Sequence, residues 1–302
     1  MSLAVKQTLA DRIFFGVLYT IMTCISVLLL YPLLWVVMTS LADPVWLSSH
    51  QVLLVPSKFS LDAYQFILSD SKLWTSYGYS VYYTAVTLIC TLFFCTLLAY
   101  PLSLPQFKAR KVIGVFILLP MFLSGGMIPE FTTISRYGLL DTVWALALPA
   151  SASTLYVILM RGNFSQISGE LREEALIDGA SEFQIFYRIV LPLSKVILVI
   201  ISLYAIVDSW NNFTSPLLYI TEDAKSPLAI YLRSLIITNK TDTLASAGAA
   251  FYQSIAAEGG ALGMRTAIKM GTIVVSVLPI MCIYPFIQKY FVKGIMLGSV
   301  KG

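Results

Sequence analysis

The sequence predicts an all-α membrane protein that crosses the bilayer six times. Of its 302 residues, 58% are hydrophobic and only 12% are charged, a balance far from that of soluble globular domains. The apolar residues are grouped into runs of about 20, the length that a helix needs to cross the hydrocarbon core. The net charge is only +4 and no basic cluster is interleaved with aromatic residues, which argues against nucleic acid as a partner.

Six apolar stretches account for the predicted spans. The first carries no charge from Ile13 to Ala42. It is too long for the apolar region of a signal peptide, so we expect it to remain as an anchor. We see neither an internal repeat nor a separate soluble domain, so residues 1–302 are expected to form one transmembrane domain. In chain order the spans are 13–38, 79–100, 112–128, 142–160, 193–213 and 268–291.

The distribution of Lys and Arg predicts the orientation of these spans. If the N-terminus is inside, the inside segments hold the majority of the 20 basic residues, although the outside loops 40–78 and 214–265 are clearly longer. Basic residues concentrate in cytoplasmic loops. We therefore expect both termini, and the segment between the fourth and fifth spans, to be cytoplasmic.

The cysteines and the single histidine do not indicate a metal or redox site. Cys24, Cys90, Cys95 and Cys282 all lie in apolar runs, and no pair has ligand spacing, so we interpret them as small core residues. His50 has no neighbouring cluster of Cys, Asp or Glu and is a poor ligand candidate. No metal site is expected.

The polar segment 170–192 predicts two short helices that meet at a corner. Gly179 stands where a helix C-terminus favours the left-handed conformation. Ser181 and Gln184 have the spacing of a capping box for the second helix. The pattern alone is equally compatible with an ordinary loop between spans. We expect one apolar face on the second helix, formed by Phe183, Phe186, Ile189 and Val190.

The residues of this segment resemble the signature of ABC-importer permeases, which is Glu-Ala-Ala, three residues, Gly, nine residues and Ile-x-Leu-Pro. Here the matching residues begin at Glu173 and end at Pro192, with every spacing met and Glu174 in place of the usual second-position Ala. The resemblance implies a coupling helix that docks on an ATPase subunit. The residues it implies for ATPase coupling are Glu173, Glu174, Ala175, Asp178, Gly179, Ala180, Phe183, Phe186, Ile189, Leu191 and Pro192.

The resemblance extends over the whole chain. Within the family, the chain is similar to the carbohydrate branch, in particular to the smaller permease of the maltose-type systems that serve complex sugar oligomers. Ile177 to Ala180 and the tail from Lys293 to Gly302 carry this part of the likeness. It implies a type I ABC-importer permease fold in a bacterial cytoplasmic membrane. It also implies four kinds of contact: a second permease, two ABC ATPases, an extracytoplasmic solute-binding protein and lipid. The tail itself is equally compatible with a disordered end.

The chain carries no Gly-x-x-x-x-Gly-Lys-Ser/Thr motif with which to cradle ATP. We therefore expect no cofactor on this chain and no enzymatic activity of its own. The resemblance implies that ATP and Mg²⁺ are bound by the partner ATPases, and that the mechanism is alternating access.

A polar stretch at the end of the fifth span predicts part of a substrate path. Asp208, Asn211 and Asn212 are spaced three and four apart and share a helical face, whereas Trp210 points to another. Carboxylate, amide and indole groups hydrogen-bond to and stack on sugars. The same residues are also ordinary at an outer membrane interface, so both interpretations stay open. We further expect Asp208 to pair with Lys269, because each is otherwise a lone charge at the membrane edge.

The sequence also bears on three other functions. An importer of amino acids or peptides is the nearest alternative, and the residues 177–180 favour carbohydrate over it. A stand-alone channel has no use for a docking segment. An intramembrane enzyme needs a nucleophile with a base or a metal triad, and the chain has no His-Glu-x-x-His and no Gly-x-Ser-x-Gly motif.

Overall fold

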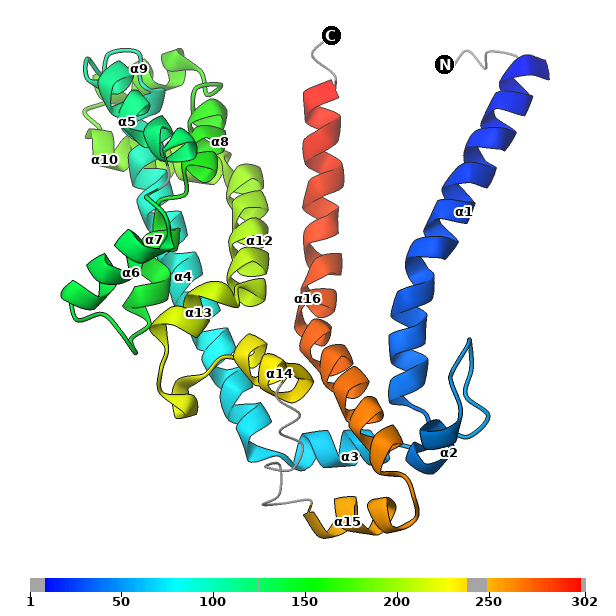
Figure 1. Ribbon diagram of the computed structural model, residues 1–302. Helices are drawn as coiled ribbons and strands as arrows, with labels where there is room; N and C mark the ends of the chain where they lie inside the picture. The colour runs from blue at the N-terminus through cyan, green and yellow to red at the C-terminus, as the bar shows by residue number, and fades with distance from the viewer. Residues whose placement is uncertain (1–8, 124, 238–248, 300–302) are drawn as a thin grey trace. The chain divides into compact units, whose positions relative to one another are not determined.

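The computed structural model describes residues 9–123, 125–237 and 249–299, and within these ranges every regular element is a helix (Figure 1). The all-α prediction is thus confirmed for the described residues. In chain order the helices are α1 (Leu9–Ser40), α2 (Pro44–Ser49), α3 (Asp62–Ser69), α4 (Ser71–Ser103), α5 (Arg110–Phe122), α6 (Met127–Arg136), α7 (Trp144–Ser151), α8 (Thr154–Phe164), α9 (Gly169–Ile177), α10 (Glu182–Ile185), the π-helix η1 (Phe186–Val190), α11 (Leu191–Leu193), α12 (Lys195–Asn211), α13 (Thr214–Tyr219), the 3₁₀-helix η2 (Asp223–Lys225), α14 (Leu228–Ile237), α15 (Ala249–Ala257) and α16 (Ala261–Ser299).

Three helices are by themselves long and apolar enough to cross a membrane: α1, α4 and the 261–283 part of α16. The number reaches six if each of three bent helix pairs is taken as one span. These pairs are α5 with α6, bent by 117°, α7 with α8, bent by 47°, and the 182–193 helix with α12, bent by 78°. The six spans and the orientation of the termini remain predictions.

Proline and glycine account for two of these breaks. Within the predicted third span, 112–128, α5 stops at Phe122 and Gly126 adopts a φ of +82° before α6 begins. Proline removes a backbone donor from a helix, and Pro149 lies within α7 just before the bend to α8. Helices bend where the backbone hydrogen-bond ladder is interrupted.

The chain packs as two units, of which unit 1 contains the described residues 9–70, 235–237 and 249–277. Two glycines of α16 allow its close approach to the N-terminal helices. A Cβ on Gly263 would collide with the backbone of Pro44, and one on Gly271 would lie 2.8 Å from Ile67 Cδ1. The Gly263 amide also donates to Ser48 Oγ at 2.9 Å.

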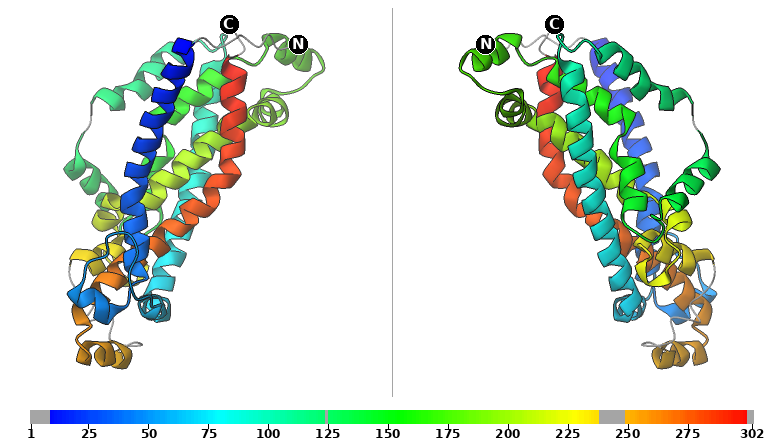
Figure 2. Two further views of the ribbon diagram at one scale, coloured as in Figure 1. Left: turned by 90° about the vertical axis from the view of Figure 1, so that its right-hand side faces the viewer. Right: turned by 90° about the vertical axis from the view of Figure 1, so that its left-hand side faces the viewer.

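Unit 2 contains the described residues of 71–234 together with 278–299. Its centre is α4, which packs against α7, α8 and α12 (Figures 1 and 2). Buried apolar side chains from α4, α8, η1 and α12 form one core, in which Cys95, Met160 and Ile201 are fully buried. This core supports both functional regions described below.

A loop contact within unit 2 ties residues 138–143 to residues 219–225. Asp141 has a φ of +59°, a conformation that Asp tolerates better than most residues. Its carboxylate accepts hydrogen bonds from Thr221 N at 2.5 Å, Thr221 Oγ1 at 2.7 Å and Glu222 N at 2.9 Å. These bonds favour the ionised form, so the pKa of Asp141 lies below its usual value.

The cysteines do not all belong to the core. Cys95 is buried, and its thiol donates to the backbone carbonyl of Ser151 at 3.3 Å. The prediction is wrong for Cys24 and Cys282, which are exposed. Each lies on an apolar helix, and exposed apolar residues on such a helix face lipid or another subunit.

Candidate functional site

The segment between α9 and α10 forms the corner that the sequence predicts. The helix α9 ends at Ile177, and Gly179 follows with a φ of +83°. The Ala180 amide donates to the Ala175 carbonyl at 2.9 Å, and the Gly179 amide donates to the Leu176 carbonyl at 3.0 Å. These two bonds are those of a Schellman motif, in which a left-handed residue ends the helix. We call residues 169–190 the α9–α10 corner.

The second arm of the corner begins with the predicted capping box. The Gln184 amide donates to Ser181 Oγ at 3.3 Å, and the Ser181 amide donates to Gln184 Oε1 at 2.8 Å. The arm then changes from α-helix to the π-helix η1 at Phe186. A π-helix has a wider turn than an α-helix, so residue positions rotate relative to the expected register.

The four residues of the predicted apolar face are divided between the core and the surface. Phe186 and Val190 are buried in the core of unit 2, and Ile185 is buried with them. Phe183 is 70% exposed instead, and Ile189 is only half-buried. A spacing rule of three and four residues holds only for an α-helix, and the arm is α-helical only as far as Ile185.

An ion pair closes the corner. Arg172 of α9 pairs with Glu182 of α10, and the same carboxylate accepts a hydrogen bond from the Tyr100 hydroxyl of α4 at 2.8 Å. The Tyr100 ring also packs on Phe186, with centroids 4.9 Å apart. Partial burial lowers the pKa of Arg172, but the Glu182 carboxylate outweighs that effect and the pKa is raised. The two arms of the corner are thereby joined to each other and to the central helix.

The residues implied for ATPase coupling divide into two groups. Glu173, Glu174, Asp178, Phe183 and Pro192 are exposed, and Gly179 shapes the backbone between them. The other five point to the core: Phe186 is buried, and the half-buried residues packed against the core are Ala175, Ala180, Ile189 and Leu191.

Two residues that sequence reasoning missed belong to the exposed group. Ile177 is 85% exposed and Tyr187 is 65% exposed. The corner therefore presents apolar side chains beside carboxylates on its free surface. Ile177 could have been noticed as an apolar residue at the helix end, but the exposure of Tyr187 depends on the π-helical register.

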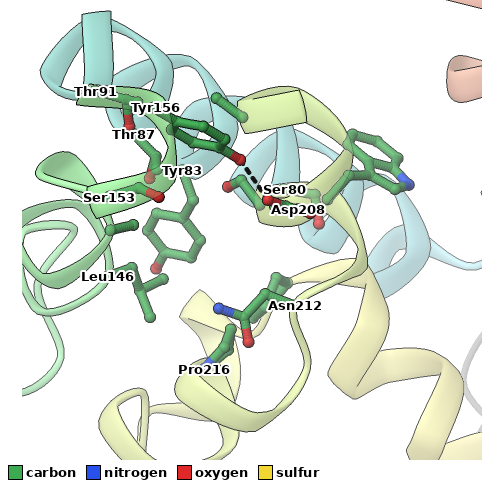
Figure 3. Close-up of a pocket in the computed structure, with 15 residues that line it drawn as sticks. Ser80, Tyr83, Thr87, Thr91, Leu146, Ser153, Tyr156, Asp208, Asn212 and Pro216 are labelled. Carbon is green, nitrogen blue, oxygen red and sulfur yellow. Dashed lines mark hydrogen bonds between the residues drawn. The ribbon is translucent and has the colours of Figure 1, made fainter. Parts of the chain in front are cut away.

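A cavity of about 190 Å³ lies within unit 2, where α4, α8 and α12 meet (Figure 3). Most of the polar groups on its wall are hydroxyls, so we call it the hydroxyl cavity. The helix α4 contributes one row of side chains along its length. The polar and aromatic residues that line the cavity are Ser80, Tyr83, Thr87, Thr91, Ser153, Tyr156, Asp208, Ser209, Trp210 and Asn212.

The Asp208 carboxylate and the Thr87 hydroxyl lie on the wall of the hydroxyl cavity and can hydrogen-bond to a bound molecule. The Tyr156 hydroxyl donates to Asp208 Oδ2 at 2.5 Å, which holds the carboxylate at the cavity wall (Figure 3). Thr87 is only 4% exposed, and its Oγ1 is buried without a hydrogen-bond partner in the part of the chain that the structure describes. A buried hydroxyl without a partner is unusual and calls for a ligand or water.

Of the four residues predicted for the substrate path, three line the cavity: Asp208, Trp210 and Asn212. Asn211 does not, because α12 ends at this residue and the cavity continues around the turn into α13. The different helical face expected for Trp210 stays a prediction. The Trp210 ring contacts Tyr77 edge to face, with centroids 5.6 Å apart. The Asp208–Lys269 pairing joins residues of different units and remains a prediction.

The wall contributed by α4 was missed at the sequence level, although a signal exists. Ser80, Thr84, Thr87 and Thr91 recur at spacings of four, three and four within an apolar helix, and all four are buried. Such a row places hydroxyls on one helical face. Polar residues on one face of a membrane-spanning helix point toward a protein interior or a cavity.

Within the described residues, no group of three or more His, Cys, Asp or Glu side chains is placed to hold a metal ion. The candidate functional regions are the α9–α10 corner, with its exposed carboxylates and apolar side chains, and the hydroxyl cavity. The first has the form of a docking surface for a protein, and the second offers hydrogen-bond partners and aromatic rings to a small polar molecule.

Comparison with known proteins places these features in a family. No protein-family model matches the chain. The chain is 37% identical to Protein LplC of Bacillus subtilis over 98% of this chain and 97% of that protein. It is 36% identical to the polygalacturonan/rhamnogalacturonan transport system permease protein YtcP of Bacillus subtilis, over 97% of this chain and 99% of that protein.

A solved structure places the chain in the same family as these sequence relatives. The crystal structure of a bacterial ABC transporter that imports the acidic polysaccharide alginate matches with a TM-score of 0.85 and 29% identity, covering 95% of this chain and 100% of that chain. The arabinooligosaccharides transport system permease protein AraQ of Bacillus subtilis is 30% identical, over 82% of this chain and 81% of that protein. The predicted resemblance is confirmed, and the chain belongs to the family of sugar ABC-transporter permeases.

Proposed function

We propose that the chain is one transmembrane subunit of an ATP-driven importer for an oligosaccharide in the bacterial cytoplasmic membrane. It would act with a second permease, two ATPase subunits and an extracytoplasmic solute-binding protein. The ATPases would bind the nucleotide and Mg²⁺, and this chain would position and gate the substrate. Among its relatives, YtcP and AraQ are named for the transport of oligomeric or polymeric sugars, and the solved neighbour imports alginate.

The observation that carries the proposal is the α9–α10 corner. Its backbone is held by the Schellman motif at Gly179, the capping box at Ser181 and the Arg172–Glu182 pair. A corner held by this many local interactions keeps its shape while exposing Ile177 and Phe183 to solvent. Exposed apolar side chains on a rigid turn are typical of a protein-docking site.

The corner is also joined to the helices that carry the cavity. Tyr100 of α4 binds Glu182 of the corner, and the same helix lines the hydroxyl cavity with Ser80, Thr87 and Thr91. A displacement of the corner by a moving ATPase would therefore act on α4 directly. This continuity supports an alternating-access mechanism in which ATPase closure changes access to the cavity.

The cavity wall supports a sugar as the transported molecule. Hydroxyls, the Asn212 amide and the rings of Tyr83 and Trp210 suit the hydroxyl groups and apolar faces of sugar rings. Asp208 is the one charged side chain among the described residues of the lining, so we expect this subunit to favour neutral sugar units over uronate units, whose carboxylates would be repelled.

Transport in proteoliposomes tests the proposal. The purified importer with its solute-binding protein is supplied with labelled neutral oligosaccharides, with or without ATP inside. Uptake that requires ATP and the binding protein is expected. Uptake without ATP would identify a channel or carrier, and ATP-dependent uptake of peptides or amino acids instead of sugars would identify the alternative cargo.

A further inference from the structure

A second cavity, of about 360 Å³, lies where the end of α4, the start of α5, the end of α8 and the start of α9 meet within unit 2 (Figure 1). Its volume is within the roughly 300–1,000 Å³ of small-molecule sites. Three arginines line it: Arg110, Arg161 and Arg172. We call it the arginine cavity. It shares no lining residue with the hydroxyl cavity.

The positive charge of this cavity is not neutralised. In the described part of the chain, Arg110 and Arg161 have no ion pair. Arg172 pairs with Glu182, but its Nε is buried and has no hydrogen-bond partner there. Glu173 is the single acidic residue among the described lining residues. A buried guanidinium donor without a partner is costly, so an anion in the cavity would be stabilised.

Backbone amides at the start of α9 also favour an anion in the arginine cavity. Ser168 and Gly169, at the start of the nine-residue helix α9, also line the arginine cavity. Ser168 makes no side-chain capping bond to the helix, so the first amide donors of α9 are not used by that side chain. Free amides and the helix dipole attract phosphate-like anions at a helix N-terminus.

The surroundings distinguish between possible anions. Arg110 begins α5, and the exposed side chains of Val112, Val115 and Phe116 follow on the same helix. Arg161 lies against that helix, since a Cβ on Gly114 would be 3.9 Å from its Nη1. A site with guanidinium groups beside an exposed apolar helix matches a lipid, with its charged headgroup and acyl chains. A protein carboxylate would make no use of the apolar side.

We propose that the arginine cavity binds the phosphate group of an anionic phospholipid from the cytoplasmic leaflet. The planar donor forks of Arg110 and Arg161 suit phosphate oxygens in a bidentate arrangement. The bound headgroup would lie beside Arg172, which also holds the α9–α10 corner. Membrane composition would then influence how firmly the corner is held. This site is independent of which molecule the protein transports.

Native mass spectrometry of the full-length chain, purified in mild detergent with whatever subunits accompany it, tests the proposal. Delipidated protein is titrated with phosphatidylglycerol, with phosphatidylcholine and with inorganic phosphate. Phosphatidylglycerol should bind at one saturable site. Arg110→Gln and Arg161→Gln should each weaken that binding about tenfold or more, as expected for the loss of a charged hydrogen-bond partner. Lys108→Gln is the matched control, because Lys108 is an exposed cation of the same loop that does not line the cavity.

Each other outcome is informative. Equal losses in Lys108→Gln and Arg161→Gln would overturn the proposal in favour of diffuse surface charge. Tight binding of inorganic phosphate that displaces the lipid would keep the phosphate chemistry and overturn the lipid as its source. Loss of a co-purifying ATPase with unchanged lipid binding would assign the cavity to a protein partner. If Arg161→Gln does not fold, Arg161→Lys retains the charge without the fork and should still weaken lipid binding.

Discussion

Arg172 and Glu182 form an ion pair across the corner between α9 and α10, and the Glu182 carboxylate also accepts a hydrogen bond from Tyr100 of α4. The two residues are ten positions apart in sequence, on the two arms of a turn that Gly179 makes possible. This pair connects the exposed surface of the corner to the helix that lines the hydroxyl cavity. We therefore expect the pair to matter more for coupling than for stability.

Disrupting this pair should uncouple ATP hydrolysis from transport. In Arg172→Gln, we expect lower substrate-stimulated ATPase activity in the assembled complex, because the two arms of the corner are no longer joined by the ion pair. The effect on unfolding should be small, about 0.5–1 kcal/mol for a partly exposed pair. Tyr100→Phe tests the link to α4 separately, since it keeps the ring contact with Phe186 and removes the hydrogen bond to Glu182. Full stimulation in Arg172→Gln would contradict this role.

Gly179→Val should damage coupling while membrane insertion stays normal. The position has a φ of +83° and open space around it, so the penalty comes from backbone strain and not from a clash. A side chain in the left-handed region costs about 1–2 kcal/mol, and a β-branched one is least tolerated. Gly179→Asn should retain more activity, because Asn tolerates this conformation.

The control for the glycine is Gly162→Val. Gly162 lies inside α8, also with open space around a built Cβ but without a positive φ. Substrate-stimulated ATPase activity is the measurement for all three variants. Normal stimulation by the Gly179→Val complex, or equal damage by Gly162→Val, would show that the left-handed turn is not needed.

Thr87→Val should have opposite effects on stability and transport. The Thr87 hydroxyl is buried without a partner among the described residues, which costs about 1–3 kcal/mol. Removing it should raise the melting temperature of the substrate-free protein. If that hydroxyl binds sugar, the same variant should transport more slowly.

Thr39→Val provides the control. Thr39 Oγ1 is likewise buried without a partner in the described ranges, but it does not line the hydroxyl cavity. Thr39→Val should stabilise the protein and leave transport unchanged. Thermal unfolding and uptake measured on both variants separate the two roles. Unchanged transport by Thr87→Val would remove Thr87 from the substrate path.

The Asp141 loop contact should make stability depend on acid pH. The pKa of Asp141 is lower in the folded protein than its usual 3.8. The stabilisation is therefore fully present above about pH 4 and is lost as pH falls through the lower, folded-state pKa. Asp141→Asn keeps a residue that tolerates a φ of +59° but removes the charge. Thermal unfolding should show wild type more stable than Asp141→Asn at pH 7, with the difference shrinking as pH falls below about 4; a difference that does not change with pH would contradict the assignment.

The features that were predictable from sequence are local. The Schellman glycine and the capping box depend on residues within four positions of one another, so Gly179 and Ser181 were identified correctly. The change from α-helix to π-helix at Phe186 was not predicted, because the residue spacing gives no sign of it. The approach of Tyr100 to Glu182 is a long-range contact that no local pattern specifies.

In the hydroxyl cavity, too, local features were predictable from the sequence and long-range contacts were not. Asp208 and Asn212 were noticed because they are polar residues at the end of an apolar span. Tyr156, the hydrogen-bond partner of Asp208, lies 52 positions away in the sequence, and no local pattern connects the two residues. Asn211 was expected on the same face as Asp208 because helical spacing was applied up to the end of α12, whereas the cavity follows the turn into α13.

Co-purification is the most direct test of the central claim. The tagged chain is extracted from its native membrane in mild detergent, and the accompanying polypeptides are identified by mass. We predict that a second, related permease and an ABC ATPase accompany the chain. Recovery of the chain alone, or only with copies of itself, would contradict an importer subunit and would leave the α9–α10 corner without the partner that its exposed surface requires.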